Sequence, residues 1–226
     1  MERRYRVNKQ KEPQAILLEA QYLPNVQYFS KLTKFPNLIL EAHENYQKGS
    51  YRNRCHIAGA NGLVRLSIPL RKGKNQQLSI RETEISYDEP WTSQHWHSIK
   101  SAYGNAPYFP YYQDEIEAFF QIRPTFLFEW NKSFLELLID LLQLSVEISL
   151  SQGFTKTVTD GILDLRGHIH PKSHRQAVDR NFQSVPYPQL FEERHGFLPN
   201  LSILDLLFCT GPQAILYLEE SYKPGE

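Results

Sequence analysis

The first forty residues alternate short apolar runs with polar breaks that contain proline. Two runs, at residues 15–19 and 38–41, have the length and the continuous hydrophobic character of buried strands. Between them, residues 26–35 place apolar side chains at helical spacing, after Pro24 and Asn25, which suit the entry to a helix. The pattern therefore predicts a strand, a loop, a helix and a second strand, the beginning of a parallel sheet.

The following segment changes to a period of two. Residues 54–70 alternate around Asn61-Gly62, the dipeptide most favourable for a type I′ hairpin turn. Residues 78–85 alternate again and predict a further strand. An antiparallel hairpin is therefore expected after the parallel start.

Helical spacing returns from residue 90. It predicts helices at residues 91–103, 113–122 and 131–150, with a break at 106–112 and with Asn131 capping the last helix. A late strand is expected at 161–166. A capping box at Ser202–Asp205 opens one more helix, which Gly211-Pro212 ends.

Together these elements predict an α/β fold. We expect a single domain at residues 14–226, with a mixed sheet, a β-loop-α-β start, an inserted β-hairpin and packed helices in the C-terminal half. Polar residues 1–13 are expected to form a flexible N-terminal segment.

Overall charge restricts the classes of function. The chain carries 25 basic and 25 acidic residues, so bulk electrostatic attraction to nucleic acid or to a membrane is not expected. There are two cysteines, no apolar leader at the start, and acids within the longest apolar stretch, residues 134–150. These features predict a cytoplasmic protein without a membrane span.

Local charge differs from the total. No Asp or Glu occurs between Asn45 and Arg81, where eight bases lie: Lys48, Arg52, Arg54, Arg65, Arg71, Lys72, Lys74 and Arg81. Arginine suits bidentate contact with phosphate or carboxylate, so this stretch predicts a cationic, anion-binding surface. The alternative is a solvated face whose acid partners lie elsewhere in the chain.

Two carboxylates come just before this stretch. Glu41 falls at the carboxyl end of a predicted parallel strand, and Glu44 follows it. Ligands of open α/β sheets bind outside such strand ends, so both acids are candidates for general acid–base catalysis. The alternative is a loop whose acids neutralise the bases that follow.

Histidines supply two further candidates. His95 shares a face of the predicted helix 91–103 with Tyr103 and is a candidate general base; the alternative is a hydrogen-bonded histidine in an aromatic core. His168 and His170 fall on the same side of an extended segment, and a zinc site there would need His174 or Asp164 as a third ligand. No cysteine pair or His-Glu-x-x-His accompanies them. We predict no metal site, and the absence of glycine-rich nucleotide motifs leaves the cofactor unknown.

An ordered set of short motifs spans nearly the whole chain. In chain order they are Tyr22-Leu-Pro with Tyr28-Phe29, then Glu41, Glu44, Tyr46 and Lys48 before Ser50-Tyr-Arg-Asn-Arg54, Asn61-Gly62, Leu66-Ser-Ile-Pro69, Trp91, His95 with Ser98-Ile-Lys100 and Ala102-Tyr103, Ala106-Pro-Tyr-Phe109, and residues 196–208. By this set the chain resembles the WbqC-like family. Residues 18–21 read Leu-Glu-Ala-Gln, where the commoner family pattern has His-Gln-Pro-Asn.

The resemblance implies a bacterial protein associated with surface-polysaccharide gene clusters, including those of O-antigen. It implies a transferase of polysaccharide or nucleotide-sugar metabolism, with transfer of an amino acid such as glycine to a sugar as one suggested reaction. The partner would be a nucleotide-sugar or another anionic small molecule. The departure at residues 18–21 favours a subgroup that relies on Glu41 and Glu44.

The resulting hypothesis assigns a role to each candidate. His95, Glu41 and Glu44 are the expected catalytic residues. The expected substrate-binding residues are Tyr22, Lys48, Tyr51, Arg52, Asn53, Arg54, Lys100, Tyr103 and Tyr108. Two alternatives stay open: a non-catalytic binding or assembly subunit with an enzyme partner in the same pathway, and a nucleic-acid-binding protein, which the isoelectric point of about 7.1 disfavours.

Overall fold

A computed structural model describes residues 13–71, 78–175 and 177–224. The larger of its two sheets is a four-stranded parallel sheet with strand order β5-β2-β1-β6. The strands are β1 (Ala15–Glu19), β2 (Asn37–Glu41), β5 (Glu147–Leu150) and β6 (Ile162–Asp164). The predicted strands at the start of the chain are confirmed, and so is their parallel pairing through an intervening helix.

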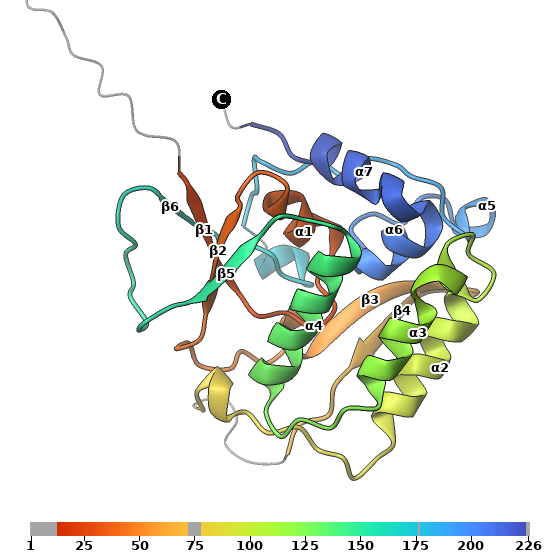
Figure 1. The fold of residues 1–226 in the computed structure, drawn as a ribbon, viewed down its shortest axis with the longest axis horizontal. Helices are drawn as coiled ribbons and strands as arrows, with labels where there is room; N and C mark the ends of the chain where they lie inside the picture. The colour runs from red at the N-terminus through yellow and green to blue at the C-terminus, as the bar shows by residue number, and fades with distance from the viewer. Residues whose placement is uncertain (1–12, 72–77, 176, 225–226) are drawn as a thin grey trace, which may run out of the picture.

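Helices cover one face of this sheet. In Figure 1 the sheet lies at the left of the molecule, with α1 (Val26–Leu32), α4 (Leu127–Leu141), α6 (Ile203–Thr210) and α7 (Ala214–Ser221) to its right. Helix α1 contacts both α6 and α7. This arrangement confirms the predicted α/β class with helices packed in the C-terminal half.

The hairpin forms a separate antiparallel sheet of β3 (Arg54–Gly59) and β4 (Gly62–Ser67). Parallel and antiparallel pairings thus lie in different sheets. The predicted turn type is wrong: Ala60 and Asn61 form the two-residue connection, and the positive φ falls on Gly62 alone, at 103°. A type I′ turn needs positive φ at both central residues, whereas a glycine placed after the turn accommodates a bulge.

Two helices pack beside the hairpin. Helix α2 (Trp91–Tyr103) has the predicted bounds and contacts β3. Helix α3 (Phe109–Phe120) begins inside the predicted break, because Pro110 lies in its first turn, where its missing N–H is not needed. Figure 1 shows α2 and α3 side by side below the hairpin, consistent with their contacts.

The prediction of a helix at residues 131–150 is wrong at both ends. Helix α4 starts at Leu127, so Asn131 is a buried interior residue and not the N-cap. Its side-chain amide donates to the carbonyl of Arg52 at 2.7 Å. The chain leaves the helix after Leu141, and residues 147–150 form β5 against β2 instead.

Residues 78–85 also depart from the prediction of a regular strand. They contain the 3₁₀ turn η2 (Ile80–Glu82), flanked by isolated bridges at Ser79, Glu84 and Ile85. The other short elements are η1 (Tyr51–Asn53), η3 (Ser173–Arg175), α5 (Glu192–His195) and η4 (Gly211–Gln213).

Helix α6 begins and ends as predicted. The hydroxyl of Ser202 accepts from the backbone N–H of Leu204, and Gly211 with φ 54° follows the last turn. The carboxylate of Asp205 turns into the core and does not close a capping box. No helix in the described part of the chain is long and apolar enough to cross a membrane. Residues 1–12, Lys72 and Lys74 lie outside the described residues.

Candidate functional site at the carboxyl edge of the sheet

The carboxyl ends of three parallel strands carry acidic side chains. Glu19 ends β1 and stands opposite Glu41, which ends β2, while Asp164 ends β6. Glu19 and Glu41 are buried, with 1% and 0% exposure. Because parallel strands all end at one edge, the fold gathers these carboxylates in the place where α/β sheets bind ligands.

Arg166 forms hydrogen bonds to the acidic side chains at the ends of two strands. Its guanidinium donates to Glu41 at 2.6 Å, to Asp164 at 2.7 and 3.0 Å, and to the carbonyl of Thr155 at 2.7 Å. The same Glu41 carboxylate also accepts from Ser151 and from the backbone N–H of His43. Glu41 therefore accepts hydrogen bonds at both oxygens, and it positions Arg166.

A second ion pair lies beside the first. Arg52, only 1% exposed, donates from two nitrogens to the two oxygens of Glu44. Burial raises the pKa of Glu44; the hydrogen-bonded Arg52 opposes this shift, and the charges of Glu19 and Glu41 add to it. The pairing matches the alternative in which the acids of this loop neutralise the following bases.

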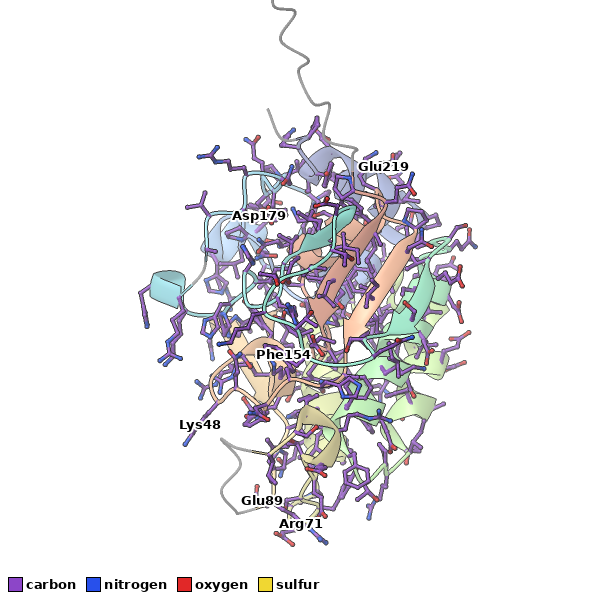
Figure 2. The ribbon with its side chains drawn as sticks, turned by 90° about the vertical axis from the view of Figure 1, so that its left-hand side faces the viewer. Lys48, Arg71, Glu89, Phe154, Asp179 and Glu219 are labelled. Atoms are coloured by element: carbon purple, nitrogen blue, oxygen red, sulfur yellow. The ribbon has the colours of Figure 1, made fainter. Side chains whose placement is uncertain are left out.

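A cavity of about 250 Å³ opens between these two ion pairs. Its lining consists of Glu44, Gln47, Arg52, Phe154, Lys156, Asp164, Arg166 and Gly167. Figure 2 looks onto this side of the molecule, with Phe154 near the centre of the view and Lys48 below it. The structure thus brings predicted residues Glu44 and Arg52 to one cavity, and adds partners from residues 154–167.

The cations of the cavity are not equivalent. Arg52 and Arg166 are both engaged with carboxylates. Lys156 is exposed and has no ion-pair partner among the described residues. Lys48 is exposed on the same side of the molecule. The cationic charge of this cavity that is available to a ligand is therefore at exposed Lys156 and not at buried Arg52.

His95 and Tyr22 meet in the core. The Tyr22 hydroxyl lies 2.9 Å from Nδ1 of His95, and the ring of Trp91 meets the His95 ring edge to face. Burial lowers the pKa of His95 to about 4, so the ring is neutral at physiological pH. Neither residue lines the carboxyl-edge cavity. This is the geometry of a hydrogen-bonded core histidine, and a catalytic role for it stays a prediction.

Most of the other predicted binding residues lie apart from the cavity. Tyr103 donates to Asp205 at 2.8 Å and accepts from the N–H of Ala58 at 3.0 Å, at the contact between α2 and α6. Lys100 is exposed on α2, and Tyr108 packs its ring against Gly211.

The cationic stretch itself divides in two. Arg52 faces the cavity, whereas Arg54 is half-buried at the start of β3, where burial and then Arg65 lower its pKa. Between them, Asn53 donates to the carbonyl of Ile68 at 2.9 Å. Tyr51 is buried with its ring edge-on to that of His56. Of the described bases in this stretch, only Arg52 lines the cavity, together with the neutral side chain of Gln47.

The histidines considered for zinc have other contacts. Nδ1 of His168 lies 3.3 Å from the carbonyl of Arg166, and Nδ1 of His170 accepts from the N–H of Lys172 at 3.0 Å. In the described ranges, no three His, Cys, Asp or Glu side chains are grouped to hold a metal ion. Cys55 is buried, and burial raises the pKa of its thiol, as for a structural cysteine.

Sequence reasoning did not assign Phe154, Lys156 or Arg166 to the site, and it considered Asp164 only as a zinc ligand. A signal existed for Asp164 and Arg166, since both lie in the carboxyl-terminal half of the strand predicted at 161–166, as Glu41 lies at the carboxyl end of the strand predicted at 38–41. Phe154 and Lys156 lie on the loop between β5 and β6. The local sequence pattern does not show which part of the fold such a loop packs against.

A parallel sheet with helices packed against it and a polar cavity at its carboxyl edge defines an α/β protein. Comparison with known proteins gives the family: the model of the WbqC-like protein family matches residues 19–180 and 170–217. The chain belongs to the WbqC-like protein family. It is similar to the uncharacterized protein Rv1507c of Mycobacterium tuberculosis, with 27% identity over 226 positions, 89% of this chain and 96% of that protein. No solved structure matches the chain.

Proposed function

We propose that this chain is a transferase of bacterial surface-polysaccharide or nucleotide-sugar metabolism and that the carboxyl-edge cavity is its substrate site. The observation that carries the proposal is the Glu44 carboxylate, which lines the cavity and whose pKa is raised by burial. A carboxylate with a raised pKa in a polar cavity is typical of a general acid or base. Family membership supports the metabolic setting.

Glu44 would accept a proton from the hydroxyl or amine of the acceptor. As that proton leaves, the acceptor oxygen or nitrogen bonds to the transferred group, and the donor's leaving group departs with the electron pair of the broken bond. Transfer of a glycyl group to a sugar is one reaction of this form. Glu44 takes the role of base from His95, because His95 is enclosed by Tyr22 and Trp91 in the core.

The remaining residues would bind and position the substrates. Arg52 holds both oxygens of Glu44 and fixes their direction. Lys156, exposed at the rim, would meet the phosphate or carboxylate of the donor, and Lys48, exposed on the same side of the molecule, would add cationic charge. Arg166 would keep Asp164 and the strand ends in place.

The first test is calorimetric titration of the purified chain with nucleotides, nucleotide-sugars and aminoacyl donors. We expect one nucleotide-sugar to bind below millimolar concentration. The variant Lys156→Ala should weaken that binding about tenfold, the loss of one charge-assisted hydrogen bond. Because Lys156 is exposed, this variant should fold normally.

The second test concerns catalysis. With the donor and acceptor found by titration, Glu44→Gln should remove transfer while binding persists, whereas the exposed control Glu89→Gln should behave as the unaltered chain. Thermal unfolding of both variants reports any loss of stability from the altered Arg52 pair. Failure of every class of ligand to bind below millimolar concentration would contradict the proposal.

One observation favours a second candidate, a non-catalytic binding subunit of the same pathway. Arg52 and Arg166 are each neutralised by carboxylates of the chain itself, so two strong anion-binding groups are already occupied. Capture of a stoichiometric enzyme partner, together with ligand binding but no turnover by the chain alone, would establish this candidate.

A further inference from the structure

Phe154 is an exposed aromatic ring at a polar cavity. It lines the cavity and is 55% exposed, although burial of an aromatic side chain is normally favourable. The guanidinium carbon of Arg166 lies 4.9 Å from the ring centroid. Arg166 is in turn fixed by its bonds to Glu41 and Asp164. One part of the ring therefore rests on a fixed cation, and more than half of its surface stays open.

The charges of the cavity favour a neutral, hydroxyl-rich group in its interior. Arg52 is paired with Glu44, and Arg166 with Asp164. Carboxylate oxygens have further lone pairs after accepting these bonds, so Glu44 and Asp164 can still accept from hydroxyl groups. A phosphate in the same place would face two carboxylates, and like charges in close contact repel one another.

The size of the cavity limits what enters it. Its volume of about 250 Å³ is below the roughly 300–1,000 Å³ of sites that hold whole drug-sized ligands. A single ring with its substituents fits this space, whereas a complete nucleotide-sugar has to extend beyond it. Lys156, exposed at the rim, is placed to meet an anionic group on the part that extends outside.

We propose that the cavity holds one sugar ring of the substrate, stacked on the open surface of Phe154, with its hydroxyls donating to Glu44 and Asp164. The negative face of an aromatic ring attracts the weakly positive C–H groups of a sugar. Arg166 holds Phe154 in place for this contact. This inference rests on the proposed function for the identity of the site and names the part of the substrate that the cavity recognises.

The experiment is saturation-transfer NMR on the full chain with three separate probes: a methyl hexoside, N-acetylglucosamine and uridine. We expect saturation of the ring C–H protons of at least one of the two sugars. Phe154→Ala should weaken that sugar's binding about fivefold, a loss typical of one aromatic contact. Phe154→Trp should retain it. The control Leu216→Ala, which removes a side chain of 60% exposure on α7, should leave sugar binding unchanged.

The outcomes separate this inference from the proposed function. If neither sugar is saturated, or if Phe154→Ala leaves sugar saturation intact, the inference is overturned. If uridine is saturated in a Phe154-dependent way and the sugars are not, the Phe154 ring stacks on a nucleobase. The inference then fails while the transferase proposal survives. If the sugars bind through Phe154 but no donor supports transfer, the inference stands and the proposed transferase activity fails.

Discussion

At the scale of single residues, burial decides what the charged and polar groups of this chain can do. Glu44 and His95 were both candidates for the same proton transfer. Burial raises the pKa of Glu44 at a cavity, but it lowers the pKa of His95 inside the aromatic core. The sequence identified both residues as chemically able, since that depends on residue type. It did not show which of the two is exposed to a ligand, because burial depends on residues far away in the sequence. Tyr22, which contacts His95, is one such residue.

The protonation of His95 gives a prediction at this scale. Its ring should titrate at a pKa of about 4 in the folded chain, against an ordinary value of 6.5. Between these values the unfolded chain holds a proton that the folded chain lacks, so the free energy of unfolding should rise with pH across this window, by up to about 3 kcal/mol. NMR titration of the ring and denaturation at each pH measure the two effects.

The matched variant is His95→Asn, which should flatten the pH dependence of stability in the same window. Ring titration near 6.5, accompanied by transfer activity that follows it, would instead support the general-base role that the sequence suggested.

At the scale of elements, the sequence predicted correctly the helices and strands whose hydrophobic pattern depends only on their own residues. The strand at residues 15–19 and the helix at 91–103 agree with the structure, because continuous burial and helical spacing are local signals. The helix predicted at 131–150 fails for the opposite reason. Residues 147–150 become a strand because β2 offers an unpaired edge, and no local pattern reports that partner.

Asp205 joins three elements and supplies a prediction at this scale. Its buried carboxylate accepts from Tyr103 of α2 and from Tyr187 and Gln189 of the segment before α5. Asp205→Ala would leave three buried donors without their acceptor, so we expect a loss of at least about 2 kcal/mol in the free energy of unfolding. Chemical denaturation measures it, with the exposed Asp140→Ala on α4 as control. Equal stability of the two variants would show that the network contributes little.

At the scale of the whole molecule, the site is assembled from distant parts of the chain. Glu41 and Arg166, in contact through one hydrogen bond, are 125 residues apart in sequence. The rule that ligands bind beyond parallel strand ends predicted the position of Glu41 and Glu44. The rule does not say which loop covers the edge, so Phe154 and Lys156 became visible only in the folded structure.

The structure offers a competing location for a ligand. A groove of about 370 Å³ lies between the hairpin and α2, lined by residues that include Ile57, Val64, His97 and Ser101. It is larger than the carboxyl-edge cavity, but none of the charged residues discussed above lines it. Cavity size favours the groove, whereas the charged side chains favour the carboxyl-edge cavity as the ligand site.

The most direct measurement is a crystal structure of the chain soaked with nucleotide-sugars. We predict ligand density at the carboxyl edge of the sheet, with the sugar ring against Phe154, a hydroxyl or amine within hydrogen-bond distance of Glu44, and the phosphates toward Lys156. Density in the groove between the hairpin and α2, with the carboxyl-edge cavity empty in the same crystal, would contradict it.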